Sequence, residues 1–261
     1  MTSSPTAASL DRPAWSLALE SLKRPYPLTV PVVVSMGALV LLVPLYIVIG
    51  EMMPGRRLHA PGTALDEMVL LQPPWAIVYG CLYLFLILLP LLVVRQEELI
   101  RRTLWTYLTV WLTAYVCFFL YPTAAPRPAS VVGPGFAVWG LRFLYGADPP
   151  FNCFPSLHVA HSCVSAMACS RVNRGVGVAA GIGAALVGVS TLFTKQHYVV
   201  DVVAGVVLAW LGYLLFLRGY PAVAIPPLDR RAAPALAVGV LGIVALVAAC
   251  FWVAYELGVV A

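Results

Sequence analysis

Long runs of apolar residues, separated by shorter polar segments, dominate the chain. Six runs are clear, and they cover residues 28–50, 73–94, 103–121, 175–193, 198–217 and 233–257. A helix rises about 1.5 Å per residue, so about 20 residues cross an apolar bilayer core about 30 Å thick. The pattern therefore predicts membrane-spanning helices.

A seventh run, at 157–171, is shorter and holds two histidines near its start. It contains neither glycine nor proline and ends at Arg171. We interpret it as a helix whose partly polar entrance lies in protein or water, because polar groups are costly in lipid. The prediction is an all-α polytopic membrane protein with seven helices. Charge spacing in "RQEELIRR", where Glu97 and Glu98 precede Arg101 and Arg102 by four residues, predicts a helical extension there.

The composition supports the same class of protein. Hydrophobic residues make up 61% and charged residues 10% of the chain, whereas soluble domains carry about 25% charged residues. Mean hydropathy is +0.91. The net charge of +5 therefore indicates basic flanks of membrane spans and no nucleic-acid partner. Five of the six cysteines lie in apolar runs, which favours packing roles over a disulfide framework.

The basic residues also predict an orientation. With the N-terminus in the cytoplasm, cytoplasmic segments hold eleven of the 16 Lys and Arg residues, as the positive-inside rule requires. The C-terminus then lies outside. Residues 1–27 read as a cytoplasmic tail or an interfacial helix, and residues 218–232 as a cytoplasmic loop. In the long outer loop 122–156, the apolar "FAVWGLRFLY" is suited to the membrane interface.

Three of the four histidines lie at the predicted outer ends of helices. The relevant segments are "YPTAAPRPAS", "CFPSLHVAH" and "TKQHYVVD". In the last, four-residue spacing on a helix would let Asp201 orient the imidazole of His197 for attack. The same pair would equally serve as a buried structural contact between helices. Both interpretations stay open from this pair alone.

The other two segments supply further groups of the same kind. Ser156 suits a helix cap, and His158 follows it at a helix N-terminus that favours anions. Arg127 lies between prolines, where it reads as a headgroup anchor or a phosphate clamp. A cap with an interfacial histidine is the simpler alternative for His158. Together these residues suit phosphoryl transfer through a phosphohistidine, which needs a nucleophile, an acid and donors for the phosphoryl oxygens.

The three segments resemble the motifs of the type 2 phosphatidic acid phosphatase superfamily, which shares its site with vanadium haloperoxidases. The family motifs read KxxxxxxRP, PSGH and SRxxxxxHxxxD. The matching residues are Arg127 and Pro128 in the first motif, Pro155, Ser156 and His158 in the second, and Ser190, His197 and Asp201 in the third. The resemblance spans roughly residues 60 to 217, and the order and spacing of three motifs make it specific.

The chain departs from these motifs at three positions. Leu120 stands at the motif lysine, Leu157 at the glycine of PSGH, and Thr191 at the motif arginine. Two cations are therefore missing, and we expect Lys195 to supply one charge. The segments look more like the branch that contains inositol phosphorylceramide synthase, which moves phospho-headgroups between lipids.

The resemblance implies a fold and a division of the chain. It implies a six-helix catalytic domain over 28–217, with an additional transmembrane helix within 233–261. The site would lie on the extracytoplasmic side, and membrane lipids would be its substrates. Neither a cofactor nor a metal ion is expected, and the sequence does not determine the oligomeric state.

It also implies roles for individual residues. His197 would attack phosphorus, Asp201 would orient it, and His158 would protonate the leaving oxygen and then activate the acceptor. Groups that would hold the phosphoryl oxygens are Arg127, Ser156, Lys195 and the amide of Leu157. Ser190 and Tyr198 would support the site indirectly. The family motif does not require His161, which lies one helical turn from His158; we expect a hydrogen-bonded supporting role for it, with a substrate contact or a catalytic role as the alternative.

Three functions remain open from the sequence. The first is a phosphotransferase similar to inositol phosphorylceramide synthase, with a lipid or polyol hydroxyl as acceptor. The second is a lipid phosphate phosphatase with water as acceptor. The third is a non-catalytic lipid-binding or transport protein, which the missing cations keep open.

Overall fold

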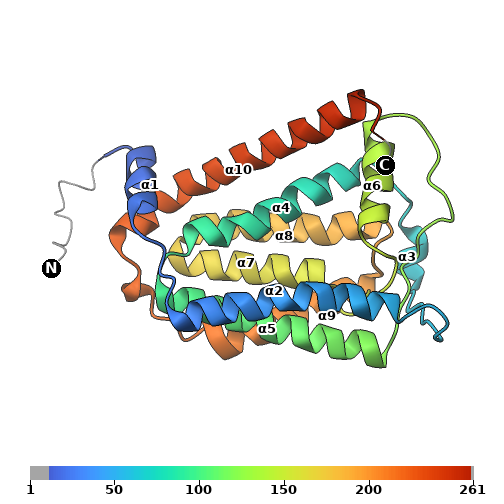
Figure 1. Cartoon of the computed structure of the whole chain (residues 1–261), viewed down its shortest axis with the longest axis horizontal. Helices are drawn as coiled ribbons and strands as arrows, with labels where there is room; N and C mark the ends of the chain where they lie inside the picture. Colours follow the sequence, from blue (N-terminus) through green and yellow to red (C-terminus); the bar gives the residue numbers. More distant parts are fainter. Residues whose placement is uncertain (1–11, 260–261) are drawn as a thin grey trace.

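The computed structural model describes residues 12–259 as a bundle of long helices with short helices across its two ends (Figure 1). The bundle helices are α2 (Val30–Glu51), α4 (Trp75–Val93), α5 (Glu97–Leu120), α7 (Leu157–Val172), α8 (Arg174–Phe193), α9 (Val199–Gly212) and α10 (Pro227–Glu256). A π-helical segment, Tyr213–Leu217, continues α9. Within residues 12–259, six helices are long and apolar enough to cross a membrane. The prediction of an all-α membrane protein is confirmed.

Helix α7 is the short run with the two histidines, and it occupies the centre of the bundle. It packs against α4, α5, α8 and α9. Eleven of its 16 residues are buried, so its polar side chains face protein rather than lipid. This is the environment that the sequence predicted for them.

Small residues allow the helices around α7 to approach closely. A Cβ atom on Gly177 of α8 would lie 2.4 Å from the Cα of Ser170, and one on Gly205 of α9 would lie 2.6 Å from the carbonyl oxygen of Ser156. Any larger residue would force these helices apart. Small residues at helix crossings are typical of membrane bundles, where van der Waals packing drives association. The contact at Gly205 holds α9 against the start of α7, where the candidate site lies.

Two helices begin earlier than their apolar runs. Helix α5 starts at Glu97, and Glu98 Oε1 accepts from Arg102 Nε at 2.7 Å, as the charge spacing predicted. Helix α10 starts at Pro227, inside the predicted cytoplasmic loop 218–232. Proline suits the first helical turn, and an acidic residue there favours the helix dipole. Hydropathy does not detect such polar first turns.

The polar start of α10 holds α1 (Ala14–Lys23) at the end of the bundle opposite α6 (Phe136–Ala147) (Figure 1). The Asp229 carboxylate is 1% exposed and accepts from Ser21 Oγ at 3.0 Å. Arg24 and the side-chain amide of Gln96 also donate to it. The N-terminal segment 14–23 is therefore a helix, whose Trp15 and Leu19 stay exposed, as an interfacial helix requires.

We expect Arg24→Ala to destabilise the protein, because it removes the charge that compensates buried Asp229. Removing one partner of a buried ion pair costs about 3–5 kcal/mol. Arg24 is itself 40% exposed, and Ser21 and Gln96 would still bind the carboxylate, so the loss should lie below that range. The apparent unfolding midpoint in detergent should fall by several degrees. Glu20→Ala, which breaks an exposed ion pair between α1 and Arg12 just before it, is the control and should cost under about 1 kcal/mol. Equal midpoints for the two variants would contradict the assignment.

The other end of the bundle, called the site end below, carries α3 (Ala64–Met68), α6 and the first turns of α7 and α9 (Figure 1). Helix α6 lies across the bundle axis, where the sequence predicted an interfacial segment. Aromatic rings of α6 and of the end of α10 contact one another: Phe136, Trp139, Phe143, Phe251, Trp252 and Tyr255. Such aromatic clusters are typical of the membrane–water interface. The direction of the chain across the membrane stays a prediction.

Candidate active site

His197 and Asp201 lie in the connection between α8 and α9 and in the first turn of α9. Asp201 Oδ2 accepts from the Tyr198 amide at 2.8 Å and lies 3.5 Å from His197 Nδ1. Both side chains are buried, at 4% and 0% exposure. Because α9 begins only at Val199, the assumption that both residues share a helical face is wrong. The helix cap made by Asp201 brings the pair together instead.

The loop that carries His197 is held by backbone contacts. The carbonyl oxygen of Thr191 accepts from the amides of Gln196, at 2.9 Å, and His197, at 3.3 Å. Thr191 stands where the resembled motif has a cation, and its hydroxyl donates to the carbonyl of Gly188. Leu120, the other motif departure, is 72% exposed. Neither position supplies a charge to the site, as the sequence indicated.

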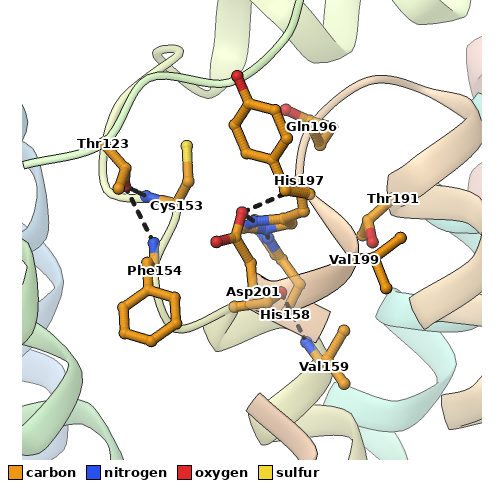
Figure 2. Close-up of polar contacts among 12 residues, drawn as sticks. Thr123, Cys153, Phe154, His158, Val159, Thr191, Gln196, His197, Val199 and Asp201 are labelled. Atoms are coloured by element: carbon orange, nitrogen blue, oxygen red, sulfur yellow. Dashed lines mark hydrogen bonds and ion pairs between the residues drawn. The ribbon is translucent and has the colours of Figure 1, made fainter. Parts of the chain in front are cut away.

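His158 projects from the first turn of α7 toward His197. Its Nδ1 lies 3.1 Å from His197 Nε2 (Figure 2). Ser156 caps α7, with Oγ 3.4 Å from the Val159 amide, and its own amide donates to the carbonyl of Asp201 at 3.0 Å. The starts of α7 and α9 are therefore bonded together, and this bond sets the two imidazoles in contact.

Arg127 reaches the same place from the long outer loop. Its side chain is 9% exposed. One terminal nitrogen donates to the carbonyl of Asp148 at 2.7 Å, and the other donates to Oε1 of Gln196. The guanidinium lies 4.4 Å from the ring centre of Tyr145. Arg127 is thus a rigid, buried cation beside the residue that precedes His197.

Asp148, which the sequence analysis did not select, completes a line of four side chains. Its Oδ2 lies 3.9 Å from His158 Nε2 and 3.7 Å from Arg127, and Tyr46 donates to Oδ1 at 2.8 Å. The order is Asp201, His197, His158, Asp148, with a carboxylate at each end. The one available signal was that Asp148 is the sole acidic residue of the loop 122–156.

Gln196 was also missed, and it brings a donor to the site. Its side chain is buried at 2% exposure, and its oxygen is held by Arg127. Gln196 Nε2 and Arg127 Nε are both buried and have no hydrogen-bond partner among the described residues. Buried donors without acceptors are costly, so these two donors, on residues that contact each other beside His197, fit an anion. Sequence reasoning missed Gln196 because the resembled motif specifies nothing at that position.

The long outer loop is fastened near the site by Thr123. Thr123 Oγ1 accepts from the amides of Cys153 at 3.0 Å and Phe154 at 3.1 Å (Figure 2). A cis peptide bond joins Phe154 and Pro155 just before the cap of α7. Burial raises the pKa of the Cys153 thiol well above its usual range, with Asp201 adding to the effect, so this thiol stays protonated and is a poor nucleophile.

Lys195 contacts the segment that forms α3. Lys195 Nζ donates to the carbonyl of Asp66 at 3.1 Å. Asp66 Oδ1 accepts from the Val199 amide at 2.8 Å, and Oδ2 accepts from the amide and hydroxyl of Thr63 at 2.7 Å. Asp66 therefore ties α3 to both flanks of His197.

The remaining predicted residues lie around the pair. Leu157 packs into the apolar core at 7% exposure. His161, one turn beyond His158, stacks on Tyr107 with ring centres 4.3 Å apart, and its Nδ1 has no partner among residues 12–259. Ser190 donates to the carbonyl of Val187 at 2.7 Å. Tyr198 is buried at 8% exposure.

Asp66 also makes the attachment of α3 sensitive to pH. Burial alone would raise the pKa of its carboxyl, but the hydrogen bonds from Thr63 and Val199 and the charge of Lys195 outweigh this and lower the pKa. A carboxyl with a lowered folded pKa stabilises the fold above the unfolded pKa, and the contribution is lost as pH falls through the folded value.

We expect Asp66→Asn to unfold at a lower temperature than the parent at neutral pH. The gap should close below about pH 4. Glu67→Gln, at an exposed position of the same helix, is the control; a gap that persists in acid would contradict this role.

The fold and the site define a polytopic membrane protein with a buried histidine–carboxylate centre at one end of its helical bundle. The sequence model of the PAP2 superfamily, the type 2 phosphatidic acid phosphatases, matches residues 58–215. The chain belongs to this superfamily, and all the site residues named above except Tyr46 fall inside the match. Searches of curated proteins and of solved structures returned no match.

Membership indicates an enzyme of the lipid phosphatase or phosphotransferase type. Residues 12–259 contain no group of three or more His, Cys, Asp or Glu side chains placed to hold a metal ion. Independence from metals stays a prediction.

Proposed function

We propose that the protein is a membrane phosphotransferase that moves a phospho-headgroup from a lipid to a lipid or polyol hydroxyl through a phosphohistidine. The observation that carries the proposal is the contact between His197 and His158, with Asp201 behind the first ring and Asp148 behind the second. This contact supports the proposal because attack and protonation must act on one phosphorus atom, which requires the two imidazoles to lie close together.

In this mechanism His197, oriented by Asp201, is the nucleophile. With Asp201 at Nδ1, His197 holds its proton on that nitrogen and keeps a lone pair on Nε2. Nε2 lies 3.1 Å from His158 Nδ1. In the first step Nε2 forms a bond to phosphorus while the bond from phosphorus to the leaving lipid oxygen breaks. His158 gives that oxygen a proton, so the leaving lipid departs as an alcohol.

The second step reverses the roles. The hydroxyl of the acceptor loses its proton to His158 and attacks phosphorus, and the bond from phosphorus to His197 breaks. His158 thereby regains the proton that it gave away in the first step. The Asp148 carboxylate faces the His158 imidazole and stabilises its positive charge. Groups proposed to hold the phosphoryl oxygens are Arg127, Gln196, Lys195, Ser156 and the amide of Leu157. Donors held in place before the reaction stabilise the transition state most effectively.

Burial of the site favours a lipid or polyol acceptor over water. His197 is 4% exposed and the His158 side chain is 15% exposed, and α6 lies across the site end of the bundle (Figure 1). Closed active sites exclude water and so prevent hydrolysis of reactive intermediates. A hydroxyl carried by a membrane-dissolved acceptor enters such a site from the lipid side.

The acceptor is tested directly by incubating the purified protein with a panel of phospholipids, with and without ceramide or diacylglycerol. Products are read by mass spectrometry, and His197→Ala is the blank. We expect the headgroup to appear on the added acceptor. Release of free phosphate or free phospho-headgroup at the same rate in both arms would instead identify a phosphatase. If the folded protein forms no product from any phospholipid, the remaining function is a non-catalytic lipid-binding or transport protein.

Lys195→Ala tests whether the ammonium contributes to phosphate binding. We expect turnover to fall on the order of 10²-fold, the effect of losing one transition-state donor, because a phosphoryl dianion needs more than one positive neighbour. The measurement is the rate of headgroup transfer under saturating donor. Turnover within about threefold of the parent would show that Lys195 serves only to hold Asp66 and α3.

A further inference from the structure

An apolar groove runs along the lipid-facing side of α7, α8 and α9. Its volume is about 440 Å³, within the range of small-molecule sites. Its lining consists entirely of apolar side chains and glycines from the three helices. It is separate from the polar site, and none of the catalytic side chains named above lines it.

The groove starts at the level of the active site. Val159 and Val202, which line it, directly follow His158 and Asp201 in sequence. From Val159 the lining continues along α7 to Met167, and from Val202 along α9 to Trp210. Eight residues of helix correspond to about 12 Å. The groove therefore leads from the phosphoryl site toward the middle of the bundle.

Small residues of α8 leave this space open. Two glycines and two alanines of α8 line the groove. A Cβ atom on Gly181 would meet no other atom within 4 Å, in contrast to Gly177, where close packing of α7 demands glycine. The space at Gly181 is thus unfilled by protein. An apolar cavity has no polar groups that could hydrogen-bond to water. This groove faces the hydrocarbon of the membrane.

We infer that this groove binds an acyl chain of the donor lipid and so aligns its phosphate with His197. The inference rests on the proposed function of the same site. An acyl chain is the occupant that fits, because it is apolar, linear and covalently joined to a headgroup at the membrane surface. The end of the groove beside Val159 and Val202 lies where the chain of a lipid reacting at His197 would enter the membrane. The far end of the groove, near Gly181 and Trp210, would then set the preferred chain length.

Filling the groove at Gly181 tests the inference. Gly181→Phe is compared with Gly80→Phe, since Gly80 of α4 lies outside the groove, is exposed, and also has open space around its Cβ position. Transfer is measured with donors that share one headgroup and carry acyl chains of increasing length. We expect Gly181→Phe to lower kcat/KM for long-chain donors relative to short-chain donors by about tenfold or more. Gly80→Phe should keep the parent ratio, and the same ratio in both variants would overturn the inference. Gly181→Leu replaces the phenylalanine variant if that variant does not fold.

A second readout does not depend on turnover. A phospholipid with a photoactivatable group near the end of its acyl chain is crosslinked to the parent protein in vesicles, and the modified peptides are mapped. Enrichment at Met167 and Trp210, lost in Gly181→Phe, supports the groove even if no lipid tested is turned over. Crosslinks spread evenly over all lipid-facing helices, with turnover intact, would reject the groove and leave the proposed function standing.

Discussion

Replacing His197 with alanine is expected to abolish both transfer and hydrolysis. If Nε2 of this side chain forms the bond to phosphorus, no other described group takes its place: the nearest imidazole, His158, is required as the acid. Loss of a nucleophile typically lowers turnover by about 10⁶-fold. The rate should therefore fall to the background of the assay, while donor lipid still binds through Arg127 and Gln196.

The control for His197→Ala is His59→Ala. His59 lies in the connection between α2 and α3 and stacks on Tyr121, with ring centres 4.3 Å apart. Removing it tests the loss of a histidine from the same end of the protein without touching the paired imidazoles. We expect His59→Ala to keep most of the parent activity. A well-folded His197→Ala protein that still transfers headgroup would end the phosphohistidine hypothesis.

Asp201→Asn is expected to leave the fold intact and to lower turnover by about 10⁴-fold. An asparagine oxygen can still accept from the Tyr198 amide and cap α9. It cannot hold the proton on His197 Nδ1 in the way a carboxylate does, so the wrong tautomer is favoured. The double variant with His197→Ala should be little worse than His197→Ala alone, because residues that act as one unit are not additive.

Asp229 supplies the contrast for this prediction. It is another buried aspartate, at the opposite end of the bundle, and it contacts Ser21 and Arg24. Asp229→Asn should lower the unfolding midpoint but leave turnover per folded molecule unchanged. If Asp201→Asn behaves in the same way, the His197–Asp201 pair is structural, which was the alternative left open by its sequence.

The sequence predicts the membrane helices well, because hydropathy and helix length act locally. Polar first turns are harder, as α10 shows by beginning at Pro227 in place of the predicted 233. Asp229 is polar by composition yet 1% exposed, since its partners come from α1 and from the connection between α4 and α5. No local pattern encodes such a contact.

The site residues also fall into two groups: those that local spacing in the sequence identifies and those that only contacts between distant segments bring together. His158, His197 and Asp201 stand at characteristic spacings, so the sequence selects them. The spacing suggested a shared helical face, whereas the structure joins His197 to Asp201 through the cap of α9. Asp148 and Gln196 could not be selected as site residues from the sequence, because their place in the site depends on how the loop 122–156 folds over the ends of α7 and α9. Their contacts with Arg127 exist only in three dimensions.

The most direct measurement is to trap the covalent intermediate. Purified protein is mixed with a donor whose phosphate carries a radioactive label and is quenched within a single turnover, in the parent and in His158→Ala. The account predicts an acid-labile, alkali-stable label on the peptide that contains His197. In His158→Ala the label should form more slowly, because the leaving oxygen is not protonated, and should then decay more slowly, because the acceptor is not activated. Product formed at the parent rate without labelled protein, or a label on any residue other than His197, would contradict the account.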